Sequence, residues 1–142
     1  MMISTRGRYA LRILTDIAEH QADSYVPLKE SAGRQDISEK YLESIVNILV
    51  KSGFIEGVRG KGGGYRLSRL PEQISVYDVL LTTEGSMAPV ACLQEGAKEC
   101  GRISLCPTLP IWNGLNDLVT DYLKRYTVKD LMKQETDRQH SI

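Results

Sequence analysis

All three cysteines of the chain, Cys92, Cys100 and Cys106, fall within fifteen residues. The segment that holds them, from Gly85 to Cys106, shows no clear helical or strand periodicity. We therefore expect a loop, and thiolates gathered on a loop are suited to binding an iron–sulfur cluster or zinc. Their spacing is wider than the paired Cys-x2-Cys knuckles of common zinc sites. Free thiols on a surface loop are the simpler alternative, which the spacing leaves open.

A second unusual segment, RGKGGGYR at residues 59–66, holds four glycines and three cations. It is not a phosphate-binding P-loop, because Gly62 follows Gly60-Lys61 where that motif requires Ser or Thr. It also differs from a flexible linker, because strand-like runs with alternating apolar residues flank it at 54–58 and 65–68. The sequence therefore predicts a β-hairpin whose glycines let the tip approach another molecule closely. A solvated charged face would explain the cations but not the glycines.

Three helices are predicted ahead of this hairpin. The first follows Ser4 and ends near His20, a short second helix covers 28–34, and the third follows the N-cap Ser38 and ends before Gly53. Two helices joined by a short turn and followed by a hairpin are typical of winged helix-turn-helix proteins, which insert a recognition helix into the major groove of DNA. The predicted DNA contacts are Ser38, Glu39, Lys40, Tyr41 and Glu43 in this helix and Arg59, Gly60 and Lys61 in the wing. Core packing of Tyr41 and plain solvation of Lys40 are the alternatives.

Charge is distributed unevenly along a chain whose net charge is zero. Residues 1–70 contain 11 Lys and Arg against 8 acidic residues, whereas residues 71–142 contain 7 and 10. A local basic patch is expected of the half that binds DNA. The chain contains no run of about 18 apolar residues, so no membrane span is predicted. The N-terminus does not resemble a signal peptide, and we therefore expect a cytoplasmic protein. The sequence pairs no nucleophile with a base and carries no nucleotide fingerprint, so we do not expect an enzyme.

A fourth helix is predicted after Ser75, to about Glu84, and a long amphipathic helix begins at Thr108 and Pro110. The apolar stripe of the long helix is too long for a small domain to cover, so we expect it to form a homodimer. The residues predicted at this interface are Trp112, Leu115, Leu118, Val119 and Tyr122. The predicted fold class is mainly α with a small β-hairpin. It comprises a DNA-binding domain (1–84), a cysteine-bearing loop (85–107), a dimerisation helix with a following turn (108–132) and a polar tail (133–142).

From about residue 3 to residue 132, the sequence resembles the IscR/NsrR/CymR family of bacterial transcriptional regulators. The matching stretches are ISTRGRYALRILTDIA, VPLKESAGRQDISEKYLESIVNILVKSGFIEGVRGKGGGYRL and the cysteine-bearing loop. The resemblance implies a homodimeric winged-helix regulator that binds a double-stranded DNA operator, with repression favoured over activation. In the iron–sulfur branch of the family, Cys92, Cys100 and Cys106 would ligate a cluster. A two-iron–two-sulfur cluster is favoured, with a four-iron–four-sulfur cluster as the alternative.

The resemblance leaves the fourth ligand of such a cluster unassigned. IscR-like proteins carry a histidine three residues after the last cysteine, where this chain has Leu109, and the NsrR-like branch has an acid near position 8, where this chain has Arg8. Glu95 and Glu99 are the nearest carboxylates in sequence. We therefore expect a regulator that senses iron–sulfur, redox or nitric oxide status. The alternatives are a cluster-free regulator of cysteine metabolism of the CymR kind and a protein-interaction module with a basic loop.

Overall fold

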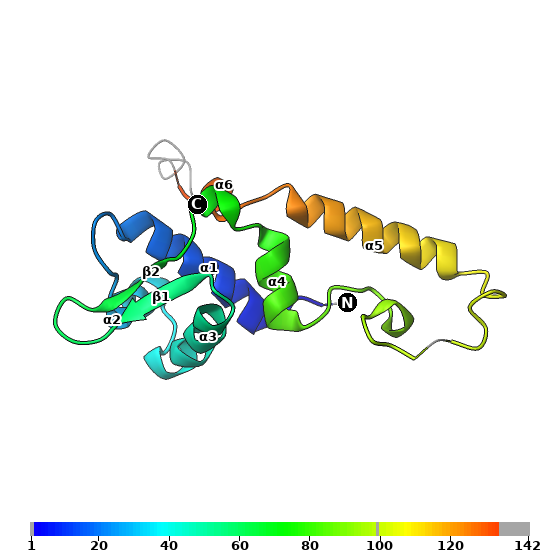
Figure 1. Ribbon diagram of the computed structural model, residues 1–142, viewed down its shortest axis with the longest axis horizontal. Coiled ribbons are helices and arrows are strands. Elements are labelled where there is room, and N and C mark those ends of the chain that lie inside the picture. The colour runs from blue at the N-terminus through cyan, green and yellow to red at the C-terminus, as the bar shows by residue number, and fades with distance from the viewer. Residues whose placement is uncertain (1, 99, 134–142) are drawn as a thin grey trace.

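Helices α1 to α3 and a two-stranded hairpin form one body, and a long helix extends away from it (Figure 1). The computed structural model describes residues 2–98 and 100–133. The elements in chain order are α1 (Thr5–His20), α2 (Leu28–Gln35), α3 (Glu39–Lys51), β1 (Ile55–Val58), β2 (Gly64–Leu67), the 3-10 helix η1 (Pro71–Gln73), α4 (Val76–Glu84), the 3-10 helix η2 (Ala91–Leu93), α5 (Leu109–Lys124) and α6 (Val128–Leu131). The predicted class, mainly α with a small hairpin, is confirmed.

Serine side chains cap three of the helices where the sequence predicts that they begin. The hydroxyl of Ser4 accepts a hydrogen bond from the backbone N–H of Gly7, that of Ser38 from Tyr41, and that of Ser75 from Asp78. Each bond satisfies one of the N–H groups that have no partner inside the first turn of a helix. These local bonds explain why α1, α3 and α4 begin at the predicted positions.

The core is built around α1, which α2, α3, the hairpin, α4 and α6 surround. Its largest fully buried side chains are Ile13, Leu14, Ile17, Leu42, Ile45, Leu49, Ile55, Ile74, Val46, Val79 and Val128. The apolar side chains Leu42, Ile45, Val46 and Leu49 of α3 are buried in this core, whereas Tyr41 is exposed. The outer face of α3 is thereby left to polar residues.

The segment after the long helix returns to this core, which the sequence pattern did not indicate. The expected turn is the short helix α6, which packs against α1 and η1, and its Val128 is fully buried. Two backbone hydrogen bonds hold it there, from Val128 N–H to the Ile74 carbonyl and from Val76 N–H to the Tyr126 carbonyl, both 2.9 Å. Both ends of the α4–α5 segment are therefore anchored on the winged body.

No residue of α5 is buried. Only its carboxyl-terminal end lies near other elements, where Leu123 packs on a small cluster formed by Val76, Leu80 and Met87. The helix ends at Lys124, so it includes all five residues predicted at the dimer interface. Figure 1 shows the other end of α5 far from the winged body, next to the loop that carries the cysteines.

Candidate DNA-binding surface and cysteine loop

The amino-terminal half of α3 presents the residues predicted to contact DNA. Ser38, Glu39, Lys40, Tyr41 and Glu43 are all exposed. Leu42, which lies between Tyr41 and Glu43 in the sequence, is buried because the helix turns its apolar face to the core. The structure therefore keeps the polar groups of this helix end accessible to a ligand, as recognition by a helix requires.

Tyr41 lies at the border between core and solvent. Its side chain is 37% exposed, and its ring meets the ring of Tyr9 of α1 edge-on, with centroids 5.9 Å apart and planes at 81°. An edge-on arrangement is a favourable geometry for two aromatic rings. The contact holds one side of Tyr41 against α1 and leaves the rest of the side chain accessible.

The wing is the hairpin β1–β2, in which Ile55 pairs with Leu67 and Val58 pairs with Gly64. Its four cations fall into two groups. Arg66 forms an ion pair with Glu56 at 2.6 Å and covers the ring of Tyr25, and Arg69 lies over Phe54. Within the described part of the chain, Arg59 and Lys61 at the tip make no hydrogen bond or ion pair, and both are exposed. These two cations remain available to an anionic partner.

Two of the wing glycines are required by the fold itself. A Cβ atom on Gly64 would lie 2.2 Å from the carbonyl oxygen of Val26, and one on Gly63 would lie 2.3 Å from that of Val58. Val26 and the neighbouring Tyr65 exchange two backbone hydrogen bonds of 2.8 Å, which explains the close approach at Gly64. Gly60 and Gly62 take positive φ angles of 95° and 77° in open space. Only these two glycines are left for an approach by another molecule.

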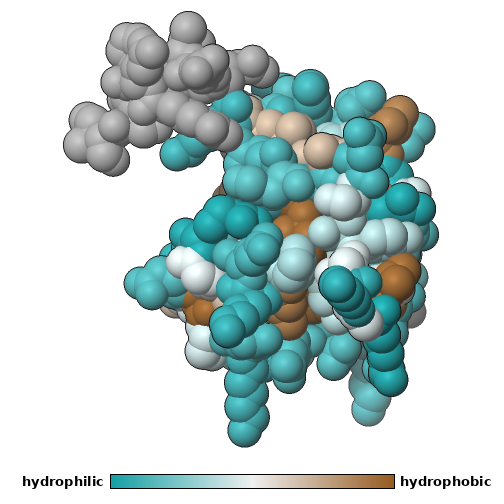
Figure 2. Space-filling model, turned by 90° about the vertical axis from the view of Figure 1, so that its left-hand side faces the viewer, coloured by the Kyte–Doolittle hydropathy of each residue, from teal (hydrophilic) through white to brown (hydrophobic). Residues whose placement is uncertain are grey.

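The surface at this end of the molecule is mainly hydrophilic. Figure 2 views the molecule from the side of α2 and the hairpin, and long hydrophilic side chains project from its lower edge. Such a surface suits a charged, hydrated partner better than an apolar one.

An acidic side chain on the core face of α1 was not singled out from the sequence. Asp16 is 1% exposed, and its two carboxylate oxygens accept hydrogen bonds from Ser31 at 2.7 Å, from Arg34 at 2.9 and 3.0 Å and from Gln35 at 3.1 Å. Burial raises the pKa of Asp16, but the hydrogen bonds from Arg34, Ser31 and Gln35 outweigh it, so the pKa lies below its ordinary value. The sequence does contain a sign of this buried acid, because Asp16 lies between Ile13 and Ile17 on the apolar face of the helix, where a carboxylate requires hydrogen-bonding partners.

The cysteine loop carries its three thiols near the surface. Cys92 and Cys100 are exposed and Cys106 is half-buried. The sulfur of Cys106 lies 3.3 Å from the hydroxyl of Thr108, and hydrogen bonding to Thr108 is the main cause that lowers the pKa of this thiol. A lowered pKa favours the thiolate, which is the form that binds metals.

The structure does not bring the three cysteines together as a ligand set. In residues 2–98 and 100–133, no group of three or more histidine, cysteine or acidic side chains is close enough to hold a metal ion. Glu95 is exposed on the same loop. Glu99 lies outside the described residues. The donor set, three thiols on an accessible loop, is nevertheless chemically suited to a cluster.

The predicted dimer residues all lie on α5. Leu118 is 70% exposed, and Leu115 and Tyr122 are exposed as well, while Trp112 and Val119 are half-buried. An open groove beside Ile3 and Met87 is lined by Leu118, Val119, Tyr122 and Leu123.

No helix in the described part of the chain is long and apolar enough to span a membrane.

Known proteins match this chain over nearly its full length. The Rrf2 family profile, described as an iron-dependent transcriptional regulator, matches residues 3–134. Protein rrf2 of Nitratidesulfovibrio vulgaris is 40% identical over 133 residues, covering 94% of this chain and 88% of that protein. The regulator IscR of Vibrio vulnificus YJ016 is 36% identical over 132 residues, covering 93% and 77%.

Solved structures of winged-helix regulators match in shape as well. CymR, the global cysteine regulator of B. subtilis, superposes with a TM-score of 0.74 at 33% identity, covering 92% of this chain and 95% of that chain. IscR of T. potens superposes with a TM-score of 0.72 at 29% identity, covering 97% and 96%. The predicted winged helix-turn-helix fold and the predicted absence of an enzymatic role are thereby confirmed. The chain belongs to the Rrf2 family of transcriptional regulators.

Proposed function

We propose that this protein regulates transcription by placing α3 in the major groove of an operator and the wing tip against the DNA backbone or the minor groove. The observation that carries the proposal is the outer face of α3, where Ser38, Glu39, Lys40, Tyr41 and Glu43 are all accessible. Lys40 and Tyr41 can donate hydrogen bonds to base edges, and Glu43 can accept one from cytosine N4. Arg59 and Lys61 carry charge to the phosphates, and Gly60 lets the backbone come close to them.

We propose that residues 1–84 bind DNA, residues 85–107 carry the sensing loop and residues 108–132 dimerise and return the chain to the winged body. The exposed apolar side chains of α5 support a homodimer, because an apolar helix face without a cover is favourable only when a partner buries it. Trp112, Leu115, Leu118, Val119 and Tyr122 would lie at this interface. Two copies would present two recognition helices, as a palindromic operator requires. A regulator that acts in this way on chromosomal DNA would work in the cytoplasm.

The sensing role is proposed for Cys92, Cys100 and Cys106. They would hold an iron–sulfur cluster through their thiolates, with a fourth ligand that is not a cysteine of this chain. Similarity to IscR and the family description as iron-dependent support this assignment. The separation of the three thiols means that the loop would have to close on binding. The cluster, when bound, would supply sensitivity to oxygen or nitric oxide, and its loss would release the loop between α4 and α5.

A cluster-free regulator of cysteine metabolism is the second candidate. It is favoured by the match to CymR and by the absence of a preassembled ligand set among the described residues. In that case the loop would respond to a different signal, and the three thiols would be free.

Anaerobic purification separates the two candidates. We expect a coloured protein with iron and sulfide bound, and loss of both in a variant with Cys92→Ala, Cys100→Ala and Cys106→Ala. Both proteins are then titrated with a promoter duplex, because a ligand shifts a conformational equilibrium only through its differential affinity for the two states. Equal DNA affinity with and without cluster would remove the sensing role and leave the DNA-binding role intact. A wild-type protein that takes up no iron would favour zinc or free thiols.

A further inference from the structure

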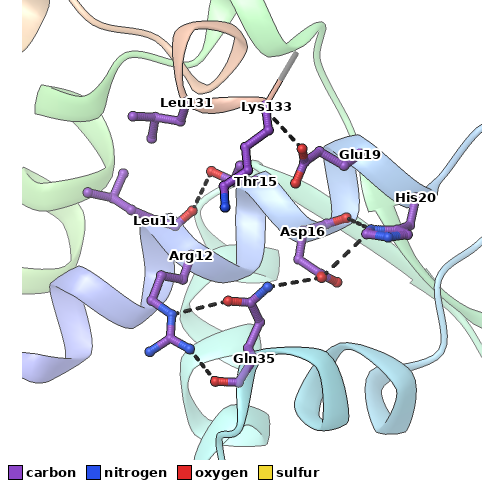
Figure 3. A pocket seen from close by; sticks show the side chains of 9 residues that line it. All are labelled: Leu11, Arg12, Thr15, Asp16, Glu19, His20, Gln35, Leu131 and Lys133. Carbon is purple, nitrogen blue, oxygen red and sulfur yellow. Dashed lines mark hydrogen bonds and ion pairs between the residues drawn. The ribbon is translucent and has the colours of Figure 1, made fainter. Parts of the chain in front are cut away.

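The turn between α2 and the recognition helix α3 is held at both of its ends by side chains of α1. At the end of α2, the guanidinium of Arg12 donates one hydrogen bond to the side-chain oxygen of Gln35 at 3.1 Å and another to the backbone carbonyl of Gln35. Gln35 is the last residue of α2, and the next residue, Asp36, takes a left-handed conformation with φ 54°. Arg12 therefore contacts the chain immediately before it turns (Figure 3).

A second contact lies at the start of α3. Tyr9, one helical turn before Arg12, meets Tyr41 edge-on at 5.9 Å. Tyr41 is the third residue of α3 and one of the exposed side chains proposed to contact DNA. Tyr9 therefore touches a DNA-facing residue from behind.

The two contacts are linked to each other on α1. The guanidinium carbon of Arg12 lies 5.0 Å from the centroid of the Tyr9 ring, within the range of a cation–π interaction. Besides accepting from Arg12, the side-chain amide of Gln35 donates a hydrogen bond of 3.1 Å to the buried Asp16, as Figure 3 shows. Gln35 is thus held between an arginine and an aspartate of the same helix, and neither end of the turn can shift without breaking one of these contacts.

We infer that Arg12 and Tyr9 are positioning residues for DNA recognition, which set the orientation of the Tyr41 end of α3 without touching DNA. This inference rests on the proposed function of α3. The guanidinium of Arg12 donates through Nε and one Nη to Gln35 and lies over the Tyr9 ring, so it is held against α2 and its own helix. The cap at Ser38 fixes where α3 begins and its buried side chains hold the helix on the core, so the contacts with Arg12 and Tyr9 act on the Tyr41 end of α3.

The test uses the full-length protein and two duplexes. One is selected by the wild-type protein from a random library, and the other is an unrelated duplex of the same length. Affinities are measured over a series of salt concentrations for Arg12→Gln, Arg12→Lys, Tyr9→Leu and the matched control Tyr9→Phe. We expect Arg12→Gln, Arg12→Lys and Tyr9→Leu to weaken binding to the selected duplex about tenfold, within the range for losing a base contact. Binding to the unrelated duplex and the salt slope should not change, and Tyr9→Phe should resemble the wild type, since the ring is retained.

Two outcomes would overturn the inference alone. If Arg12→Gln weakens binding to both duplexes and lowers the salt slope by about one, while Arg12→Lys does not, Arg12 is a phosphate contact. If all variants bind the selected duplex as the wild type does, the contacts with α1 do not position α3. Arg12 is exposed, so its variants decide the matter even if Tyr9→Leu fails to fold. A wild-type protein that selects no duplex would overturn the proposed function as well.

Discussion

Single cations of the wing differ in what they can offer to DNA, although the sequence presents them as one basic run. Lys61 and Arg59 are exposed at the tip, whereas Arg66 is paired with Glu56 at 2.6 Å. We expect Lys61→Ala to lower the slope of log affinity against log salt by about one, for one lost phosphate contact. Arg59→Ala should weaken specific binding by about 1–3 kcal/mol if Arg59 reads a groove edge.

Arg66→Ala is the matched control, because it removes a wing cation that is already engaged. Gel shifts over a salt series would measure all three variants against the wild type. Equal effects of Arg66→Ala and Lys61→Ala would contradict this division of the wing cations, and unchanged affinity in both tip variants would mean that the tip is only solvated.

The buried carboxylate of Asp16 should make the stability of the protein depend on pH. Its pKa in the folded state lies below the ordinary value of about 3.9, so its ionised form stabilises the protein above that pH. This contribution is lost as the pH falls from about 4 through the lower folded pKa, where the carboxylate becomes protonated. Asp16→Asn should reduce the free energy of unfolding at neutral pH by about 1–3 kcal/mol, because the hydrogen bonds to the carboxylate are weakened.

Urea unfolding of the wild type and Asp16→Asn between pH 3 and pH 7 would measure this difference. The two proteins should differ most at neutral pH and converge toward the acid end of this range. A difference that stays constant over the whole range would mean that the charge of Asp16 contributes nothing.

At the scale of an element, the hairpin depends on its glycines for two different reasons. Gly64 leaves no room for a Cβ atom beside Val26, whereas Gly62 has a positive φ but open space around it. Gly64→Ala should lower the free energy of unfolding by about 2–4 kcal/mol, because the backbone must shift and the Val26–Tyr65 hydrogen bonds open. Gly62→Ala should lower it by only about 1–2 kcal/mol, the cost of a left-handed conformation with a side chain. Urea unfolding of both variants compares them directly, and similar losses would argue against the close approach at Gly64.

The long helix α5 extends from the winged body (Figure 1), and its side chains Leu115, Leu118 and Tyr122 are exposed. We expect the wild type to sediment as a dimer at micromolar concentration. The double variant Leu118→Glu with Tyr122→Glu should sediment as a monomer or aggregate, because dimerisation would bury charges without partners. Asn113→Glu, an exposed position on the opposite face of α5, is the control and should remain dimeric. A wild-type monomer would contradict the homodimer.

Features that depend on neighbours within three or four residues could be predicted from the sequence. The caps at Ser4, Ser38 and Ser75, the apolar spacing of α1 and α3, and the strands on either side of the glycine run all express such local preferences. The family resemblance and the gathering of three cysteines in one segment could be read from the sequence for the same reason, since both are patterns along the chain.

Contacts between residues far apart in the sequence could not be predicted in this way and are seen only in the folded chain. Arg66 and Lys61 look alike in the sequence, but Glu56 lies opposite Arg66 in the hairpin register. Gly64 is required by Val26, 38 positions earlier, and Val128 enters a core built mainly by residues 10–80. Such contacts form because the folded chain must bury apolar surface and satisfy the backbone groups that it encloses, and the sequence order does not state which segments will do so together.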